Sequence, residues 1–470
     1  MSTGMPFLDA AQLDVIHGDA LGILETVGVR MHSDEALDLL RRAACHIDGD
    51  LVRIPRGVVS AAIASTPRSW AVFDRAGRQA IEIGAGRTYF GTADVAPWIL
   101  DHRTGIRRPF ALSDTRDAGR LSDALPNIDF VCPFGEPQDV PAAGAAVDAF
   151  VALCESTAKP IAFVVPDVRS AQAVIDIAAA VRGNAAALRE QPYVFTLLQA
   201  ISPLSYGNDA LEKILLFARQ GVPIFIAPAP ALGATAPVTI GGALIQSAAE
   251  ALAGLVIAQL AGPGARAGIG AGISPMDMRH GTFVVGTPEH ALANAAFIEY
   301  VRWLGLPVWT NGCSSQSKLP DQQAAIEAFV TCYTAALEGA DIVYDCGYLE
   351  TGMMSSLEML VLMDEHHGFV RRIVRGVDLS DDARALDVIR AVGPGGNYLA
   401  EDHTAARFRQ EIWAPVLMDR SPYERWVDAG STSMGERARA RIERLLATHA
   451  PEPLDPALAA RARAIAGGLE

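Results

Sequence analysis

The chain has 470 residues, of which half are hydrophobic, one fifth are charged and 7% are aromatic. This composition is that of a globular protein, and the length suits one large domain with extensions or two to three ordinary domains. The 39 basic and 54 acidic side chains give a net charge of −15, without a Lys/Arg-rich block that could bind a phosphate backbone. No segment reads as a membrane span of about 18 apolar residues, and residues 1–20 lack the regions of a secretory signal. We therefore expect a cytoplasmic protein that binds neither nucleic acid nor membrane.

The six cysteines are widely scattered along the sequence. None of them belongs to a C-x-x-C pair, so their spacing predicts neither a disulfide framework nor a zinc knuckle. A cytoplasmic protein keeps such cysteines reduced. They are Cys45, Cys132, Cys154, Cys313, Cys332 and Cys346.

The first 85 residues predict helices followed by a small mixed segment. Apolar residues recur at helical spacing over 13–29, and a second helix is expected over 33–44. Short strand-like runs follow at 51–55 and 70–74. Residues 1–85 are therefore interpreted as an N-terminal α/β extension.

From about residue 88 to residue 350, short apolar runs alternate with longer segments of helical periodicity. After the first, the runs are apolar almost throughout, as expected for parallel strands that are buried on both faces. Eight strands that alternate with helices match a (β/α)8 barrel in number and length. The eight runs are 89–96, 128–134, 160–166, 192–200, 222–230, 266–273, 306–312 and 341–347.

A doubly wound open sheet is the alternative fold with the same alternation of elements. It predicts a G-x-G-x-x-G sequence after the first strand, which is absent, and a P-loop signature is absent as well. The glycines at 268, 270 and 272 lie inside a predicted strand, where small residues make room in a barrel lumen. We therefore predict a (β/α)8 TIM barrel over residues 86–400. Beyond a GPGG break at 393–396, residues 401–470 are predicted to form a C-terminal helical segment.

In a barrel of this kind the site lies at the C-terminal ends of the strands, and these ends are poor in the usual catalytic groups. No histidine directly follows a strand, and the pair His366–His367 falls on the helix after the last one. Cys313 and Cys346 are at the predicted mouth without a histidine beside them in the sequence, so no bound metal is expected. Lys318 is the one lysine near a strand end, and a Schiff-base aldolase is the chemistry that it would support.

Aromatic residues are better represented near the predicted mouth. Phe134, Phe195, Trp309 and Tyr348 are at or near strand ends. Most strand aromatics are core residues, but several ring faces around one cavity suit a quaternary ammonium ion. His403 follows the GPGG break, where a structural histidine that bonds a loop is the simpler interpretation.

The sequence resembles the trimethylamine methyltransferase (MttB-like) family over nearly its whole length, and the matching blocks occur in the family's order. The block at 228–265 and the block at 346–365 are the longest. The residues that carry the resemblance are VGVRMHSDEALDLLRRA (27–43), LVRIPRGVV (51–59), SPL (202–204), PAPALGATAPVTIGGALIQSAAEALAGLVIAQLAGPGA (228–265), GTPEHAL (286–292), SQSKLPDQQA (315–324), CGYLETGMMSSLEMLVLMDE (346–365), VGPGGNYLAEDHT (392–404) and EIWAPVLMDRSPYERW (411–426).

The resemblance implies a (β/α)8 barrel that transfers a methyl group from an amine to the cobalt of a separate corrinoid protein. Founding members of the family use pyrrolysine to act on trimethylamine, whereas this chain has only standard residues, with the corresponding position near 311–314. Neutral trimethylamine is a poor methyl donor, because its leaving group would be an amide anion. A quaternary amine leaves as a neutral tertiary amine. The resemblance therefore implies in-line displacement by cob(I)amide on a quaternary donor, with glycine betaine the first candidate.

Such a reaction requires no acid, base, nucleophile or bound metal from the barrel itself, which has only to bind, orient and desolvate the donor. Aromatic faces would hold the trimethylammonium group, and polar side chains would hold a carboxylate. A corrinoid protein is the expected partner, and a homo-oligomer is an expected assembly. The candidate substrate-binding residues are Phe134, Phe195, Gln199, Ser202, Trp309, Asn311, Cys313, Gln316, Tyr348 and His403.

Other functions remain open from the sequence. Proline betaine, carnitine and γ-butyrobetaine are alternative donors for the same chemistry. A barrel lyase or aldolase that uses Lys318, and a betaine-binding barrel without turnover, are alternatives from other classes.

Overall fold

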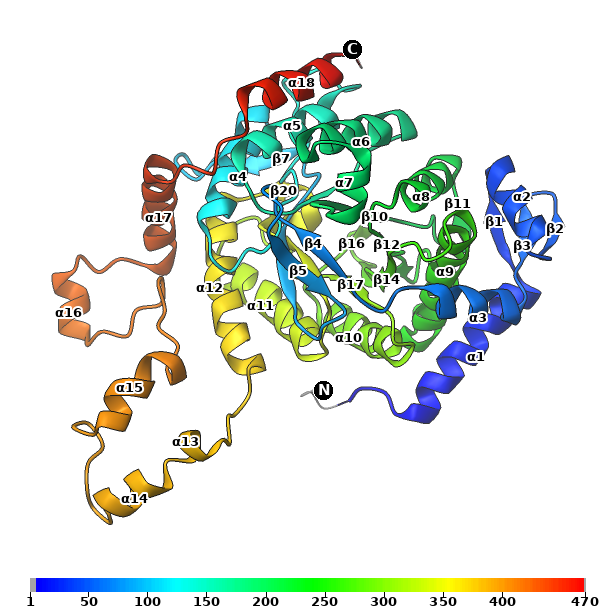
Figure 1. The fold of residues 1–470 in the computed structure, drawn as a ribbon. Coiled ribbons are helices and arrows are strands. Elements are labelled where there is room, and N and C mark those ends of the chain that lie inside the picture. The colour runs from blue at the N-terminus through cyan, green and yellow to red at the C-terminus, as the bar shows by residue number, and fades with distance from the viewer. Residues whose placement is uncertain (1–5, 469–470) are drawn as a thin grey trace.

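The structure is a computed structural model that describes residues 6–468, and its centre is a closed barrel of parallel strands (Figure 1). Seven strands form one sheet in the order β6-β18-β17-β14-β12-β10-β9. Residues 129–131 complete it, because parallel bridges join Phe130 to Gly91 of β6 and Val131 to Ile161 of β9. The predicted (β/α)8 barrel is therefore confirmed. The strands are β6 (Tyr89–Thr92), β9 (Ile161–Phe163), β10 (Val194–Leu198), β12 (Ile224–Ile226), β14 (Ala267–Ala271), β17 (Val308–Asn311) and β18 (Ile342–Cys346).

Glycines within the strands make room for large side chains in the lumen. A Cβ atom on Gly91 would lie 2.0 Å from the ring of Phe130, and one on Gly270 would lie 2.1 Å from the carbonyl oxygen of Trp309. Because real Cβ atoms do not approach other atoms so closely, only glycine fits at these two positions.

The outer layer consists of helices that return the chain from each strand to the next. The longest of them, α9, is apolar enough over 22 residues to pass for a membrane span, although the sequence suggested no such segment. Most of it is buried inside the protein, which is typical of a core helix. The helices are α4 (Leu112–Ala124), α5 (Ala145–Ser156), α6 (Val168–Arg182), α7 (Ala185–Glu190), α8 (Asn208–Gln220), α9 (Ile240–Ala261), α10 (Pro288–Trp303), α11 (Gln322–Leu337) and α12 (Leu357–Val374).

The N-terminal extension covers one end of the barrel. Its hairpin β4–β5 lies across the N-terminal ends of the strands, where Trp70 and Ile81 join the same buried cluster as Phe225 and Trp309 (Figure 1). That end of the lumen is therefore filled by side chains. The elements of the extension are α1 (Ala10–Thr26), β1 (Val29–Met31), α2 (Asp34–Arg42), β2 (His46–Asp48), β3 (Leu51–Arg53), α3 (Arg56–Ser65), β4 (Trp70–Phe73) and β5 (Gln79–Ile83).

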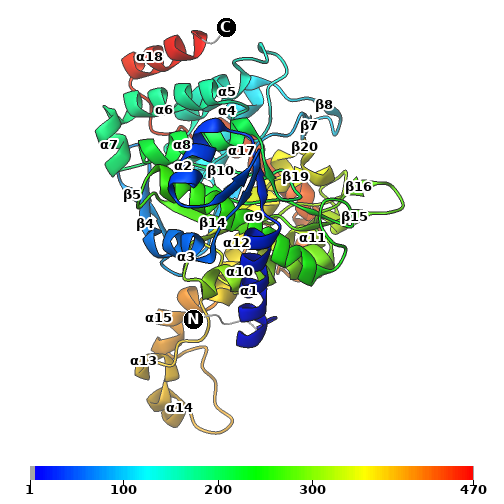
Figure 2. The ribbon, with the colours of Figure 1, turned by 90° about the vertical axis from the view of Figure 1, so that its right-hand side faces the viewer.

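The opposite end of the barrel carries the loops that follow the strands, which project to one side in Figure 2. Several of these loops contain short strands that pair with one another, and β20 pairs with β7 so that the loops after the last and the first barrel strands are joined. These elements are β7 (Trp98–Leu100), β8 (Arg107–Pro109), β13 (Ala231–Leu232), β15 (Ser274–Asp277), β16 (Thr282–Phe283), β19 (Tyr348–Leu349), η1 (Glu350–Gly352) and β20 (Met354–Ser355). The loop after β10 contains β11 (Ser205–Tyr206), which pairs with β1 of the N-terminal extension.

After α12 the chain leaves the barrel as an arm, residues 376–432, that extends away from the body (Figures 1 and 2). None of the four helices of the arm has a buried side chain. Glu365 of α12 holds the returning chain by accepting hydrogen bonds from the backbone N–H groups of residues 416–418. The arm contains α13 (Asp381–Arg384), α14 (Leu386–Val392), α15 (Asp402–Glu411) and α16 (Tyr423–Asp428).

The last two helices, α17 (Met434–Thr448) and α18 (Pro456–Gly467), pack back onto the barrel. The buried Arg441 of α17 forms an ion pair with Asp364 of α12, with a nitrogen–oxygen distance of 3.1 Å. The described part of the predicted C-terminal segment, residues 401–468, thus comprises the second half of the arm and two helices that belong to the barrel's outer layer.

Candidate active site

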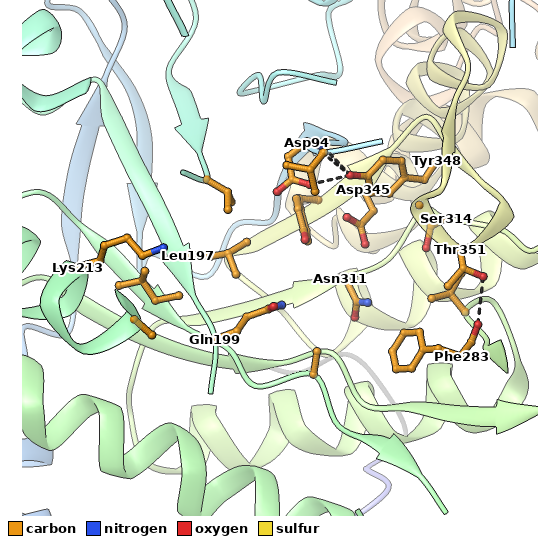
Figure 3. Close-up of a pocket in the computed structure, with 18 residues that line it drawn as sticks. Asp94, Leu197, Gln199, Lys213, Phe283, Asn311, Ser314, Asp345, Tyr348 and Thr351 are labelled. Carbon is orange, nitrogen blue, oxygen red and sulfur yellow. Dashed lines mark hydrogen bonds between the residues drawn. The ribbon is translucent and has the colours of Figure 1, made fainter. Parts of the chain in front are cut away.

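A cavity of about 400 Å³ opens at the C-terminal ends of the strands, where barrel enzymes hold their sites (Figure 3). Its volume is in the range of small-molecule sites. Its walls come from the barrel strands β10, β17 and β18, from the loops that follow the strands, and from two residues of α8. The lining residues are Asp94, Val95, Val164, Leu197, Leu198, Gln199, Ala210, Lys213, Ala229, Phe283, Val285, Asn311, Ser314, Tyr344, Asp345, Tyr348, Thr351 and Gly352.

Two buried carboxyl groups, Asp94 and Asp345, face the cavity from neighbouring barrel strands. Asp94 accepts a hydrogen bond of 2.7 Å from the hydroxyl of Tyr348, whereas one carboxylate oxygen of Asp345 has no partner among the described residues. Burial raises the pKa of both groups, and the charge of Asp94 raises the pKa of Asp345 further. No Lys, Arg or His side chain of the described chain offsets these effects at either group. A cation in the cavity would therefore be stabilised by both carboxylates.

Aromatic rings stand beside these carboxylates. Tyr344 and Tyr348 line the cavity, and so does Phe283 of the hairpin β15–β16, which lies next to Thr351 in Figure 3. The ring of Trp309, deeper in the lumen, packs against that of Tyr344 with 4.6 Å between the ring centroids. Electron-rich ring faces next to carboxylates form a suitable environment for an alkylated ammonium group.

The other end of the cavity is basic and polar. Lys213 of α8 and Gln199 lie across the cavity from Asp94 and Asp345 (Figure 3). The ammonium group of Lys213 donates hydrogen bonds to the carbonyl oxygens of Val165 and Pro166, at 2.7 and 3.1 Å. The cavity is therefore polarised, with acidic groups at one end and a basic group at the other.

Two polar atoms of residues that line the cavity have no hydrogen-bond partner within residues 6–468. They are the Oδ1 atom of Asn311, at the end of β17, and the Oγ atom of Ser314. Because buried polar groups are nearly always hydrogen-bonded, atoms left free in a cavity wall are available to a ligand or to water.

Residues with left-handed backbone conformations surround the cavity. Asp345 has a φ angle of 79° and Cys313 one of 63°, and the loop after β18 contains two more at Glu350 and Thr351. At Asp345 the pairing of β18 with β6 shifts register between Val343 and Cys346. Such strained residues concentrate at functional sites, where the conformation places a side chain that regular geometry would point elsewhere.

The structure brings three of the sequence-predicted residues together in the cavity lining: Gln199, Asn311 and Tyr348. Gln316 lies in the adjoining wall, where its side-chain amide donates a hydrogen bond of 3.3 Å to the carbonyl oxygen of Phe283. Phe195 and Trp309 lie deeper in the lumen, in the buried cluster with the hairpin β4–β5.

The other four predicted residues lie away from the cavity lining. Phe134 is fully buried in the main core, and the hydroxyl of Ser202 donates a hydrogen bond of 2.7 Å to Glu250 of α9. Cys313 is directed away from the lumen, towards His367. His403 lies on α15 in the arm, which the structure does not bring to the strand ends.

Lys318, the residue considered for Schiff-base chemistry, is exposed and donates a hydrogen bond to the carbonyl oxygen of Gln316. It does not line the cavity; the lysine that does is Lys213, on a helix. Sequence reasoning also missed both carboxylates, because they stand inside apolar runs that were interpreted as strand cores. A charged residue within a buried strand was the signal that could have found Asp345.

These features define a (β/α)8 barrel protein with a polarised ligand site at the carboxyl ends of its strands. The chain belongs to the trimethylamine methyltransferase (MTTB) family, whose model matches residues 2–465.

Several known proteins are similar to this chain over most of their length. The trimethylamine methyltransferase MttB of Desulfitobacterium hafniense (strain DSM 10664 / DCB-2) is 32% identical over 469 residues, which cover 98% of this chain and 93% of that protein. The glycine betaine methyltransferase of Desulfitobacterium hafniense (strain Y51) is 30% identical over 455 residues, with coverages of 96% and 95%. The crystal structure of the Methanosarcina barkeri monomethylamine methyltransferase aligns over 94% of this chain and 96% of its own, with 13% identity and a TM-score of 0.46.

Proposed function

We propose that this protein is a corrinoid-dependent methyltransferase that takes a methyl group from a small quaternary ammonium zwitterion, with glycine betaine as the first candidate. The acceptor is the cob(I)amide of a separate corrinoid protein. Family membership supports methyl transfer from an amine. The charge distribution of the cavity supports the zwitterion, and proline betaine and carnitine share that charge pattern.

The observation that carries the proposal is the arrangement of Asp94 and Asp345 opposite Lys213. A trimethylammonium group has no N–H donor, so it is held by charge and by ring faces, as the two carboxylates and the tyrosines provide. The carboxylate of a betaine is complementary to the ammonium group of Lys213 and to the amide of Gln199. A neutral amine would leave both charged ends of the cavity without a counterpart.

The residues of this chain then contribute binding and orientation, because the donor already carries its leaving group. When the methyl group departs, the N–CH3 bonding pair stays on nitrogen, and a neutral tertiary amine forms without proton transfer. The rings and carboxylates have to hold the ammonium group with one methyl directed outward, while the cavity excludes water. The corrinoid supplies the nucleophilic cobalt centre that accepts the methyl group.

The rim of the cavity fits a protein partner that delivers such a cofactor. Large apolar side chains are exposed on the loops that follow the strands, among them Val95, Ile201, Val238, Met278 and Met353. Exposed apolar residues that ring a pocket are typical of protein interaction surfaces. We propose that the corrinoid protein docks on this rim, which brings its cofactor to the cavity mouth.

The arm supports a homo-oligomer as a further part of the proposal. Its helices have ten or fewer residues and no buried side chain, so they are too short to be stable without a packing partner. Exposed apolar residues of the arm, such as Leu399 and Phe408, are interspersed with side chains of both charges. A surface of this kind can pair with the same surface of a second copy of the chain. The arm extends on a different side from the rim (Figure 2), so a second copy there leaves the rim open to the corrinoid protein.

Calorimetric binding to the purified protein tests the assigned ligand class without a corrinoid. The ligands are glycine betaine, tetramethylammonium and trimethylamine at a pH at which trimethylamine is partly neutral. We expect glycine betaine to bind more tightly than tetramethylammonium, because only the zwitterion engages both ends of the cavity. Equal affinities for these two, or preferential binding of trimethylamine, would contradict the proposal.

We also propose that the protein is located in the cytoplasm. None of its six cysteines forms a disulfide, as is usual for a protein of that compartment.

A further inference from the structure

Three cysteines and one histidine meet behind the wall of the cavity. Cys313 follows β17, Cys346 ends β18, Cys332 is on α11 and His367 is on α12. The Nε2 atom of His367 is 3.5 Å from the Sγ of Cys313 and 3.4 Å from the Sγ of Cys346. The ligand atoms of Cys313, Cys332 and His367 all lie within 4.8 Å of one another. All four side chains are fully buried.

We propose that Cys313, Cys332, Cys346 and His367 bind one tetrahedral zinc ion that fastens the ends of β17 and β18 to the helices behind them. Three thiolates and one imidazole are a ligand set of structural zinc sites. The sequence did not suggest this site, because the nearest two cysteines in it are 14 residues apart and no histidine is adjacent to any of them.

The two sulfur–nitrogen distances fit a zinc centre, and Cys346, which is outside the group of three within 4.8 Å, has to move towards Cys332 when the ion binds. With Zn–S bonds of about 2.3 Å and Zn–N bonds of about 2.0 to 2.1 Å, a tetrahedron has sulfur–nitrogen edges of about 3.6 Å. The two measured separations are within about 0.2 Å of this value.

Without a metal, the thiols of Cys313 and Cys346 both lie within hydrogen-bond distance of the same Nε2 atom of His367, which can pair with only one hydrogen atom at a time. Zinc binding releases three protons from the thiols to solvent, while the lone pair of neutral His367 completes the fourth bond.

The neighbouring aromatic ring supports the same assignment. The imidazole of His367 stacks on Phe90 at 4.0 Å between centroids, with 6° between the ring planes, so its orientation is fixed. A metal-binding histidine needs such a fixed ring orientation.

The proposed zinc ligands Cys313 and Cys346 are each next in sequence to a residue that lines the cavity. Cys313 adopts its left-handed conformation one residue before Ser314, and Cys346 directly follows Asp345 at the register shift in β18. Ser314 and Asp345 both line the cavity. A zinc ion would therefore hold two strained strand ends in the conformation that directs these side chains into the cavity.

The test is the zinc content of the full chain, produced in zinc-supplemented medium and purified without chelators. We expect about one zinc per chain in the wild type and in the control Cys154→Ala, a fully buried cysteine outside the cluster. In Cys332→Ala the content should fall towards zero. Wild-type protein without zinc, or zinc retained in Cys332→Ala, would overturn the proposal.

Cobalt loading provides a second readout that does not depend on how a variant folds. Wild-type protein that takes up one Co²⁺ should show the thiolate-to-cobalt charge-transfer absorption of a tetrahedral thiolate site, and zinc should displace it. Absence of this absorption after loading would also overturn the proposal. Both readouts are independent of methyl transfer, so a failure of the proposed function leaves the test of the metal site intact.

Discussion

Replacing Asp345 by asparagine removes the carboxylate that a bound cation would stabilise, with little change of shape. Asparagine has nearly the same volume and tolerates the left-handed conformation that Asp345 adopts, with its φ angle of 79°. The hydrogen bond between Tyr348 and Asp94 does not involve this side chain. The substitution therefore isolates the electrostatic contribution of one carboxylate to ligand binding.

The size of the effect follows from the charge and burial of the site. A trimethylammonium nitrogen approaches a carboxylate oxygen to about 4.5 Å, where two unit charges attract by about 4 kcal/mol at an effective dielectric constant of about 20. Desolvation of Asp345, whose pKa burial raises well above its ordinary value, offsets part of this attraction. We expect a net loss of about 2 kcal/mol, which weakens glycine betaine binding about 30-fold.

Calorimetry of glycine betaine binding to wild type and Asp345→Asn measures this loss directly, with Asp176→Asn on the exposed face of α6 as the control. Thermal unfolding of the ligand-free proteins supplies a second readout. Because the substitution removes a buried carboxylate oxygen without a partner among the described residues, Tm should stay the same or rise. Unchanged betaine affinity in a folded variant would refute the assignment of the acidic end as the ammonium site.

Four further results are expected. Lys213→Met should weaken binding of glycine betaine about 10-fold while leaving tetramethylammonium binding nearly unchanged, because a charged hydrogen bond contributes about 1.5 kcal/mol; equal losses for both ligands in calorimetry would contradict this. Burial raises the pKa of Asp94 and a bound cation lowers it again, so betaine binding should release protons and strengthen as pH rises, and proton uptake in calorimetry would reverse this sign. Asp364→Asn should lower the free energy of unfolding by about 3 kcal/mol in denaturant titrations, because it leaves the buried Arg441 without its carboxylate; a loss below about 1 kcal/mol would contradict this. Leu399→Glu in the arm should reduce the molar mass seen in light scattering to that of the monomer, whereas a monomeric wild type would contradict the proposed oligomer.

The barrel could be predicted from the sequence because its signal repeats. Eight apolar runs recur between helical segments, and strands that are buried on both faces leave this pattern wherever they occur. The second run is the weakest in the structure, where residues 129–131 form only single bridges to their neighbours. The arm could not be predicted in the same way, because its path depends on contacts at Glu365 that are distant in sequence.

The site could be predicted only in part. Gln199, Asn311 and Tyr348 were found because they stand where strands end, and position in a barrel follows from strand order. Phe195 and Trp309 were placed at the mouth, but a strand position does not tell how deep a side chain lies in the lumen, and the hairpin β4–β5 fills the space around both.

The missed residues depend on local backbone geometry and on several elements at once. Asp345 faces the cavity through a register shift that no pattern in the sequence announces. Lys213 reaches the cavity from a helix surface, where lysine is usually solvated. The cluster around His367 combines two strand ends with two helices, so it exists only in the folded chain.

The most direct test of the central claim is methyl transfer observed by absorption spectroscopy. The purified protein is mixed anaerobically with a reduced corrinoid protein or with free cob(I)alamin, glycine betaine is added, and the spectrum is followed while the amine product is identified by mass spectrometry. The account predicts enzyme-dependent formation of the methylated corrinoid and of dimethylglycine in equal amounts. Turnover of trimethylamine in place of glycine betaine and other quaternary amines would contradict it.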